Sequence, residues 1–509
     1  MNAPISITDL AEQPVHLVLR GVLEARSPIS LGSGEATPFQ DMTLVRDASG
    51  LPLIPGSSLA GVLRSHYAAR TGSAEQAAHW FGQAERNAER ASRVSISSAS
   101  IHGSDDRPVS GLVDPAEIAG DPVLGLLSRD APVLRDHVRI GEAGVADDAG
   151  KFDRALIPSG ARFSFEIFLR ASDAERSEAR AFLSALAGIM TSPLFRLGGA
   201  TRRGYGRAAI DLESSHLGEW DLTQESGRKA QLAYARSELG DRPEACGFQP
   251  IEQDVDTTVE AVVIRSKVSQ LEGSFLRTGA GPAIPVRHAG EGQEARDPDA
   301  SPLVEAAIVY EDGKGRIETG PDSGNSLRFV LPGSGIKGAI RHRTLFEWRR
   351  LTGTACDDDD ARREWAQLFG AIADTVDGKA TGQAGAVYVE DSVIECSRAD
   401  LERHLVHLDH VVIDRFTQGV RDGLLFGETA LFGTSFDIEL AIDNRRTAGL
   451  DPSLKKAFCR AVMALLSGRL AVGANDGDGM GRLVAENGAA AEEVLTGWSS
   501  REQVGETAA

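Results

Sequence analysis

A glycine-rich loop in the first half of the chain combines residue types that can hold a nucleic-acid backbone. Residues 198–206 contain four glycines, and Arg202, Arg203 and Tyr205 stand between them. Glycine allows a ligand to approach the backbone closely, a guanidinium binds phosphate, and an aromatic ring adds a further contact surface. These residues predict a cradle for RNA.

A matching loop in the second half differs in charge. Residues 473–481 carry Asn475, Asp476 and Asp478 in place of the arginines. Carboxylates repel a phosphate unless a cation intervenes. We therefore interpret the second loop as a turn.

Two predicted helices begin with a Pro-Gly-Ser motif. In the first, Ser57 and Ser58 follow the Pro-Gly pair, and Arg64 lies further along the helix. Free N–H groups at the positive end of a helix dipole suit a phosphate, although an ordinary capped helix is the alternative. The second motif, at 332–335, repeats this pattern. Its candidate RNA contacts are Ser334, Lys337 and Arg341.

These motifs belong to an internal repeat. The Pro-Gly-Ser motifs and the closing glycines of the two loops recur about 275 residues apart and in the same order. Between them, residues 136–140 and 409–413 also match, and they contain His137 and His410. A single histidine is more often structural than catalytic. Because a histidine recurs at the same place in both halves, we weigh an RNA contact equally with a structural role. The matched landmarks indicate a duplicated domain.

The composition is that of a folded protein with more than one domain. Its 509 residues exceed the roughly 250 to 300 at which a single core stops growing. The first residues lack a secretion signal, and no apolar run is long enough to cross a bilayer, which predicts a cytoplasmic protein without a membrane partner. Four dispersed cysteines fit neither a disulfide framework nor a zinc site. The net charge of −20 excludes a generally basic surface, so RNA contacts must be local.

Strands and helices interleave in each half, which predicts an α+β fold. Apolar and β-branched residues predict opening strands at 15–23 and 258–265. Alternating strands follow at 161–167 and 434–440, and residues 174–187 have the spacing of a helix.

The repeat divides the chain into two domains. We expect the first over residues 1–215 and the second over residues 256–498. Residues 216–255 are polar and are interpreted as a linker, and residues 499–509 as a disordered tail.

The combination of motifs resembles the RAMP superfamily. The loops near the end of each half, the turn at 54–58, and the Phe-Gly segments at 80–82 and 368–370 are typical of it. The pattern is most similar to the Cas-seven family, the repeated backbone subunits of CRISPR type III effector complexes in antiviral defence. Two fused copies resemble the double-Cas-seven subunit of type III-D complexes. The resemblance implies two tandem ferredoxin-like (RRM-like) domains with thumb-like insertions, and it leaves residues 104–135 and 281–299 uncovered.

The resemblance also implies a nuclease. In the family, an aspartate shortly before the Pro-Gly-Ser-Ser turn cleaves target RNA with a divalent metal, and Asp41 occupies that place here. One carboxylate can hold a hydrated Mg²⁺ or orient a 2′-hydroxyl for in-line attack on its own phosphate. A lone aspartate in a loop is usually a turn former, and Asp47 is the nearest rival.

The second half departs from this pattern. Aligning residues 307–310 with residues 43–46 puts Glu305 opposite Asp41, and Asp299 lies nearby. Glu305 is therefore the second candidate catalytic carboxylate, but a second cleavage site does not follow from the alignment.

Further RNA contacts are expected on the thumb-like insertions. Guanidinium groups bind phosphate in a forked geometry, and an aromatic ring can wedge between bases or simply pack. The candidates there are His137, Arg139, Arg154, His410, Arg415 and Phe416.

These observations favour an RNA-guided endoribonuclease subunit. Both halves would hold the guide RNA, the thumbs would splay the duplex, and Asp41 would cut the target RNA, with sequence specificity supplied by base pairing. A non-catalytic guide-RNA-binding scaffold is the alternative, and a guide-processing nuclease using histidine chemistry is a third. The implied cofactor is Mg²⁺. The implied protein partners are other type III subunits, including Cas-ten-like and further RAMP proteins.

Overall fold

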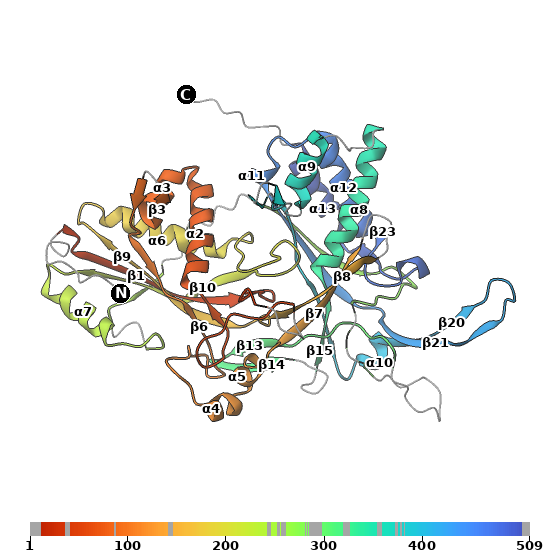
Figure 1. Cartoon of the computed structure of the whole chain (residues 1–509), viewed down its shortest axis with the longest axis horizontal. Helices are drawn as coiled ribbons and strands as arrows, with labels where there is room; N and C mark the ends of the chain where they lie inside the picture. Colours follow the sequence, from red (N-terminus) through yellow and green to blue (C-terminus); the bar gives the residue numbers. More distant parts are fainter. Residues whose placement is uncertain are drawn as a thin grey trace.

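The computed structural model shows two halves of the same architecture, and the long helices that cover the two sheets lie on the same side of the molecule (Figure 1). The structure describes residues 12–35, 41–85, 88–140, 146–241, 246–251, 255, 261–279, 281, 283–284, 298–318, 326–353, 359–371, 375–376, 379–380 and 382–500. No helix in these stretches has the length and apolarity needed to span a bilayer.

The first half is built on an antiparallel sheet. Strand β1 (Val15–Ala25) lies between β9 (Arg162–Ala171) and β10 (Ala208–Asp221). Strands β5 (Val94–Ile96) and β6 (Ala99–Ile101) pair with the far side of β9. If the four core strands are numbered along the chain, with β5 and β6 together as the second, their order across the sheet is fourth, first, third, second. This is the order of a ferredoxin-like βαββαβ unit. Two short strands extend the edges, β2 (Leu53–Ile54) and β11 (Gln249–Pro250).

Three helices cover one face of this sheet: α2 (Gly56–Thr71), α3 (Ala74–Phe81) and α6 (Arg176–Thr191). The buried residues of α6 recur three and four positions apart, so they form one apolar stripe. Phe182 on this stripe stacks on Trp80 of α3, with ring centroids 4.7 Å apart. This packing belongs to the main core of the half.

The second half repeats the plan. Strand β12 (Ala261–Gln270) lies between β22 (Ser435–Asp443) and β24 (Arg482–Ala485), while β18 (Val387–Val389) flanks β22 and β23 (Ser467–Ala471) flanks β24. The strand order is again fourth, first, third, second. Four helices cover the sheet: α8 (Gly333–Thr352), α9 (Asp359–Phe369), α12 (Pro452–Leu466) and α13 (Gly488–Ser499). The predicted α+β class with two tandem ferredoxin-like domains is confirmed.

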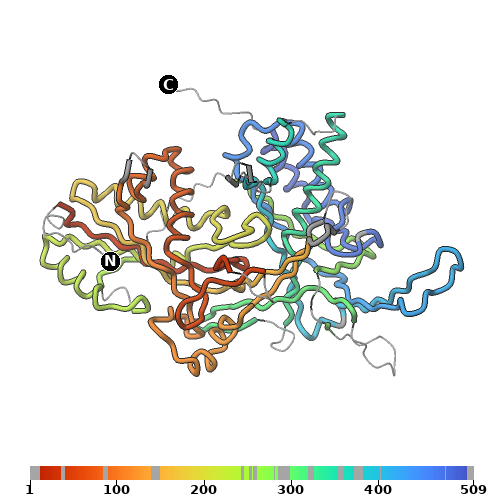
Figure 2. The backbone as a smooth tube through the Cα atoms, in the orientation of Figure 1, coloured from red at the N-terminus to blue at the C-terminus, as the bar shows by residue number. Residues whose placement is uncertain are grey.

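Each half sends out a long β-hairpin. In the first half β7 (Val133–Ile140) pairs with β8 (Ala146–Leu156), and this hairpin lies across the second half. In the second half β20 (Leu405–Ile413) pairs with β21 (Val420–Leu431), and this hairpin projects far from the body of the molecule (Figure 2). These hairpins are the thumb-like insertions.

The remaining elements are short. They are β3 (Gln83–Glu85), β4 (Ala88–Arg90), α4 (Pro115–Gly120), α5 (Pro122–Leu127), β13 (Ala307–Glu311), β14 (Lys314–Glu318), β15 (Ser326–Leu331), β16 (Thr375–Val376), β17 (Lys379–Ala380), β19 (Ser392–Ser397), α10 (Leu401–His404), α11 (Asn444–Thr447) and the single-turn 3₁₀ helix η2 (Asp476–Asp478). Cys246, Cys396 and Cys459 carry free thiols, and Cys356 lies outside the described residues.

The segment 216–255, expected as a linker, contains ordered structure. Strand β10 continues to Asp221, and α7 (Glu225–Ala235) follows it. Trp220 is 2% exposed and stacks on Tyr234 with ring centroids 4.8 Å apart. The segment interpreted as a linker is thus partly folded, because a few aromatic residues in a polar stretch suffice to bury a small satellite core. Of the expected tail, residues 501–509 lie outside the described chain.

The halves interlock. The β13–β14 hairpin of the second half packs on the core of the first half, where Ile308 is 2% exposed. Gly160 has a φ of 84° and lies where a Cβ would come 1.6 Å from the carbonyl oxygen of Ile308, so this approach requires glycine. In return, Arg196 forms a buried bidentate ion pair with Glu390 of the second half. Side chains of both halves therefore form one interface.

Candidate functional site

Asp41 lies at the base of the β7–β8 hairpin and is exposed. Its main-chain N–H donates to Asp153 Oδ1 at 2.9 Å, and the N–H of Asp153 donates to Asp41 Oδ2 at 3.1 Å. This reciprocal bonding fixes the loop against β8. Within the described chain, Asp41 Oδ1 and Asp153 Oδ2 have no hydrogen-bond partner. The sequence singled out its neighbour Arg154 but not Asp153.

A histidine lies on the same hairpin, opposite Phe152 on the partner strand. His137 of β7 stacks on Phe152 of β8, with centroids 4.9 Å apart and an interplanar angle of 18°. Burial, followed by the charges of Arg135, Arg154 and Arg203, lowers the pKa of His137 to about 4. The imidazole is therefore neutral at physiological pH, and the arginines dominate the local charge.

Arg154 and Arg203 are cations near His137. Arg154 Nη1 lies 3.1 Å from Met42 Sδ, one residue beyond Asp41. Arg203 is exposed on the glycine-rich loop. Burial lowers the pKa of Arg154, and the charge of Arg203 lowers it further. In the described part of the chain neither guanidinium pairs with a carboxylate, so a phosphate between them would relieve their repulsion.

Tyr205 and Arg202 of the same loop have structural roles. Tyr205 is 0% exposed, and its hydroxyl lies 2.7 Å from His137 Nε2, so no base can stack on its ring. Arg202 Nε donates to the carbonyl of Gly385 at 3.0 Å, and its guanidinium lies 4.8 Å from the ring of Tyr388. Arg202 thus attaches the loop to the second half. The burial of Tyr205 contradicts its expected contact with RNA, whereas Arg202 is half-buried and its expected contact stays a prediction.

The glycines of the Pro-Gly-Ser motifs are required by packing. A Cβ at Gly56 would lie 2.3 Å from the carbonyl oxygen of Ile96, and one at Gly333 would lie 2.5 Å from that of Val389. Each helix therefore begins directly against a strand. The helix starts differ in charge, because the N–H of Gly333 donates to Asp391 Oδ1 at 2.8 Å. A carboxylate already occupies the second helix start, where a phosphate was expected.

The polar residues after the two motifs also differ. At the first helix start Ser57, Ser58 and Arg64 are exposed. At the second, Ser334 is half-buried, and Lys337 is 8% exposed and donates from Nζ to the carbonyl of Val387 at 2.8 Å. Burial, followed by nearby arginines, lowers the pKa of Lys337 to about 7. Lys337 points into the protein, which contradicts its expected contact with phosphate. Arg341 is exposed.

Glu305 is also buried. Only 4% of it is exposed, and its carboxylate pairs in a bidentate manner with Arg135 of β7, with Oε2 2.7 Å from Nη2. Arg135 also lies 2.6 Å from Asp391 Oδ2. Glu305 therefore joins the halves and cannot meet a target RNA, so its expected catalytic role is contradicted.

Asp299 occupies the place equivalent to Asp41. It is exposed, and its Oδ2 accepts the N–H of Gly427 on β21 at 2.8 Å. In the first half, Asp41 accepts the N–H of Asp153 on β8 in the same way. The alignment missed this equivalence because it was anchored on β13, whereas the pairing with the hairpin decides which aspartate reaches the site.

The second site has the same scaffold but a different charge. His410 stacks on Phe426 with centroids 4.9 Å apart and an angle of 17°. Glu428, which is 1% exposed, accepts hydrogen bonds from Asn475 Nδ2 at 2.8 and 3.0 Å, lies 2.8 Å from His410 Nε2, and pairs with Arg277 at 2.6 Å. The arginine of this site is thus neutralised inside the protein. This arrangement agrees with the interpretation of the second loop as a turn.

The hairpin tips lie apart from both sites. Phe416 at the tip of β20–β21 is 97% exposed, and Arg415 beside it is also exposed. Arg139 lies near the end of β7, and its side chain is outside the described part of the structure. Arg415 and Phe416 therefore cannot contact the same atom of a bound RNA as Asp41 or Asp299.

A sequence model of the RAMP superfamily matches the chain twice, over residues 22–209 and residues 276–484. Each match contains one hairpin, one exposed aspartate at its base and one glycine-rich loop. No curated protein matches the chain in sequence. Among the described residues, no group of three or more histidine, cysteine, aspartate or glutamate side chains is placed to hold a metal ion.

Proposed function

Because the chain belongs to the RAMP superfamily in both halves, we propose that it is a subunit of a CRISPR type III RNA-guided effector complex that binds guide RNA and cleaves complementary target RNA at Asp41. In this proposal it is a double-Cas-seven-type subunit, as in type III-D complexes. Its partners are guide RNA, target RNA, a Cas-ten-like subunit and further RAMP proteins. The observation that carries the proposal is the exposed Asp41, which is hydrogen-bonded to the half-buried Asp153, with Arg154 against the neighbouring Met42 and without a carboxylate partner in the described chain.

A divalent metal fits this pair. Mg²⁺ is commonly held by one or two carboxylates together with water and substrate phosphate, so a cluster of three protein ligands is not required. Asp41 and Asp153 would hold it, because each has one carboxylate oxygen without a hydrogen bond in the described chain. Bound there, Mg²⁺ would stabilise the charge that develops on the scissile phosphate.

The neighbouring side chains would bind and orient the RNA. Arg154 and Arg203 would hold the phosphates on either side of the cleaved bond, since both lack a carboxylate partner in the described residues. His137 is neutral and its Nε2 is hydrogen-bonded to Tyr205, so it is poorly placed to exchange a proton with RNA. This favours carboxylate chemistry over the histidine chemistry of a guide-processing nuclease.

The second half would mainly hold RNA. Gly427 stands where the first site has Asp153, so Asp299 lacks a second carboxylate beside it. Glu428 also removes the local positive charge. We therefore expect Asp41 to support faster cleavage than Asp299, and a non-catalytic guide-RNA scaffold remains the alternative for the whole chain.

The test is target cleavage by the reconstituted complex. A labelled RNA complementary to the guide is incubated with Mg²⁺, and the products of wild type, Asp41→Asn and Asp299→Asn are mapped. Asparagine keeps the oxygen that accepts the main-chain N–H but removes the charge. Asp47→Asn is the matched control, because Asp47 Oδ1 accepts the N–H groups of Ser49 and Leu51, both at 2.9 Å, in a turn.

We expect Asp41→Asn to remove one cut, while guide binding measured by gel shift stays unchanged. The Asp47→Asn complex should produce every cut. If all cuts persist with Asp41→Asn and Asp299→Asn, the nuclease lies in another subunit and the chain is a scaffold.

A further inference from the structure

The outer face of α8 is basic and carries an exposed aromatic ring. Phe346 is 55% exposed and lies in a hollow of about 390 Å³. Its neighbours around this hollow include four basic side chains and one indole ring: Arg341, His342, Arg349, Arg350 and Trp365. Arg341 lies 5.5 Å from the ring of Trp365. In a chain with a net charge of −20, this is a local concentration of positive charge.

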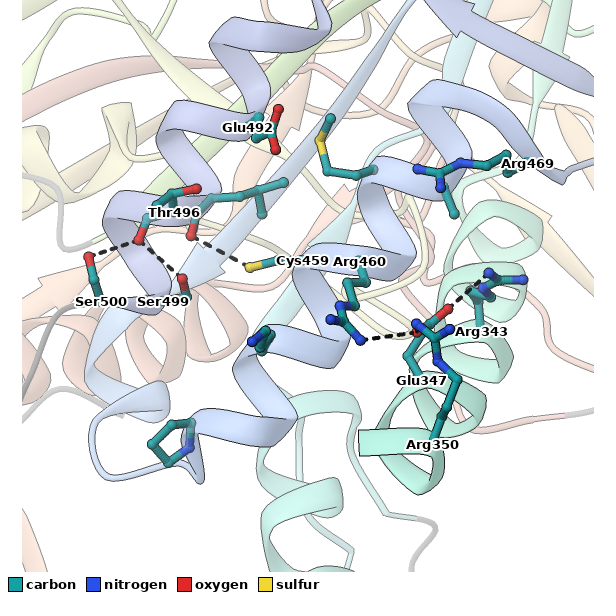
Figure 3. A pocket seen from close by; sticks show the side chains of 15 residues that line it. Arg343, Glu347, Arg350, Cys459, Arg460, Arg469, Glu492, Thr496, Ser499 and Ser500 are labelled. Atoms are coloured by element: carbon teal, nitrogen blue, oxygen red, sulfur yellow. Dashed lines mark hydrogen bonds and ion pairs between the residues drawn. The ribbon is translucent and has the colours of Figure 1, made fainter. Parts of the chain in front are cut away.

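A second basic hollow adjoins the first. It has a volume of about 670 Å³ and lies between α8, α12 and α13 (Figure 3). Its basic residues are Arg343, Arg350, Lys456, Arg460 and Arg469, against the carboxylates of Glu347 and Glu492. Arg350 lines both hollows, so they form one continuous basic surface, which we call the α8 face.

Glu347 holds the arginines of this face in place. It is 2% exposed, and its carboxylate lies 2.9 Å from Arg343, 2.7 Å from Arg350 and 3.8 Å from Arg460. One buried carboxylate thus orients three guanidinium groups and leaves excess positive charge. The Nε of Arg343 is buried and has no hydrogen-bond partner in the described structure. Lys456 is exposed at the rim.

The α8 face is absent from the first half. When α2 and α8 are aligned at their Pro-Gly motifs, Ala69 stands where Phe346 stands, and Ser65 stands where His342 stands. The face is therefore not part of the repeated architecture. Neither Asp41 nor Asp299 lines either hollow of the α8 face.

We propose that the α8 face binds single-stranded nucleic acid, with the backbone on its arginines and an unstacked base on Phe346. Guanidinium and ammonium groups replace the counterions of phosphates, and an exposed ring stacks on a base of any sequence. A duplex conceals its base faces, and an acidic peptide has none, so the exposed ring selects a single strand. The proposal goes beyond guide binding and target cleavage and does not require either.

The test is fluorescence anisotropy with the full chain and a labelled oligouridylate of about ten nucleotides, at several salt concentrations. Every variant is made in an Arg154→Ala/Arg203→Ala background, so that the first cleavage site does not mask the result. We expect Phe346→Ala to weaken binding about tenfold, because stacking contributes about 1 to 3 kcal/mol per base. The conservative Phe346→Tyr variant should restore it.

Charge and ring have separate readouts. Lys456→Ala should lower the slope of log K against log salt by about 0.7, the value for one phosphate contact on a single strand. The matched control is Arg363→Ala, because Arg363 is exposed and pairs with Asp360 at 3.3 Å on α9. Duplex binding should not change with Phe346→Ala.

Two outcomes would overturn the proposal. In the first, binding is unaffected by both Phe346→Ala and Lys456→Ala. In the second, polyglutamate of equal charge competes as well as unlabelled oligouridylate, which would identify the surface as one for an acidic protein segment. Loss of target cleavage without loss of this binding would affect only the proposed nuclease.

Discussion

Arg135→Met tests whether a buried ion cluster holds the two halves together. Arg135 is 3% exposed and reaches from the β7–β8 hairpin to two carboxylates of the second half, Glu305 and Asp391. Burial raises the pKa of Asp391 even though Arg135 opposes the shift. Methionine has a similar length and no charge, so the substitution removes the cation without opening a large cavity.

The expected loss of stability is large. Removing one partner of a buried ion pair costs about 3 to 5 kcal/mol, because the remaining charge is left without compensation. Here two carboxylates lose the cation that they share, so we expect the upper part of that range. A loss of about 5 kcal/mol corresponds to a decrease in Tm of roughly 10 to 20 °C for a domain of this size.

The loss should depend on pH with a definite sign. Without Arg135, the folded-state pKa of Asp391, which burial already raises, should rise further above its unfolded value of about 4. The folded state then binds more protons than the unfolded state between those pKa values, so stability falls as pH rises through that window. The deficit relative to wild type should therefore be smaller at about pH 5 than at about pH 8.

The assay is urea denaturation followed by tryptophan fluorescence at both pH values. Arg363→Met is the control, because the exposed pair of Arg363 with Asp360 contributes little. The reasoning is refuted if Arg135→Met is no less stable than this control, or if its deficit is greater at the lower pH. Glu305→Gln should also destabilise the chain while leaving the cleavage pattern of the complex unchanged.

Three further predictions follow from individual contacts. Gly56→Ala should lower the free energy of unfolding in urea by several kcal/mol, because the new Cβ would meet a carbonyl oxygen at 2.3 Å. Gly61→Ala is the control: a Cβ there would have nothing within 4 Å, so the free energy of unfolding should stay unchanged or rise by about 0.5 to 1 kcal/mol. The pKa of Lys337 falls to about 7 on folding, so the wild-type protein gains stability as pH rises from about 7 to about 10. The stability of Lys337→Met relative to wild type should therefore be greater by about 2 kcal/mol at pH near 6 than at pH near 9. An equal difference at both pH values would contradict this pKa. The ring protons of His137 should titrate near pH 4 by NMR, and Tyr205→Phe should cost about 1 kcal/mol by removing its 2.7 Å hydrogen bond; a His137 pKa near 6.5 would show that the ring is not buried among cations.

Local sequence patterns were sufficient to predict the duplicated fold. Alternating and helical spacings located the main elements, for example α6, whose expected residues 174–187 overlap the observed Arg176–Thr191. The closing glycines were also informative. A Cβ at Gly206 would lie 2.2 Å from the carbonyl of Leu197, and one at Gly481 would lie 1.9 Å from that of Val472. Such steric requirements act within a few residues, so they leave a readable mark on the sequence.

The candidate site was only partly predictable. Asp41 is exposed as expected, and Arg154 contacts the neighbouring Met42, but Glu305 was assigned a catalytic role and Lys337 an RNA contact, and both are buried. A charged residue in a motif looks the same whether it faces solvent or an ion partner in the other half. Its environment depends on segments that lie far away in the sequence.

The sequence by itself determined the repeat and the α+β class, because these depend on local periodicity and on motifs that recur in register. The ferredoxin-like arrangement and the choice of Asp41 were implied by the resemblance to the RAMP superfamily. Only the tertiary structure decided that Asp299, and not Glu305, matches Asp41. That equivalence rests on an N–H from a hairpin strand more than a hundred residues away, Gly427 for Asp299 and Asp153 for Asp41. Long-range pairing of this kind is set by how the hairpins fold back on the domains, and no spacing within the chain records it.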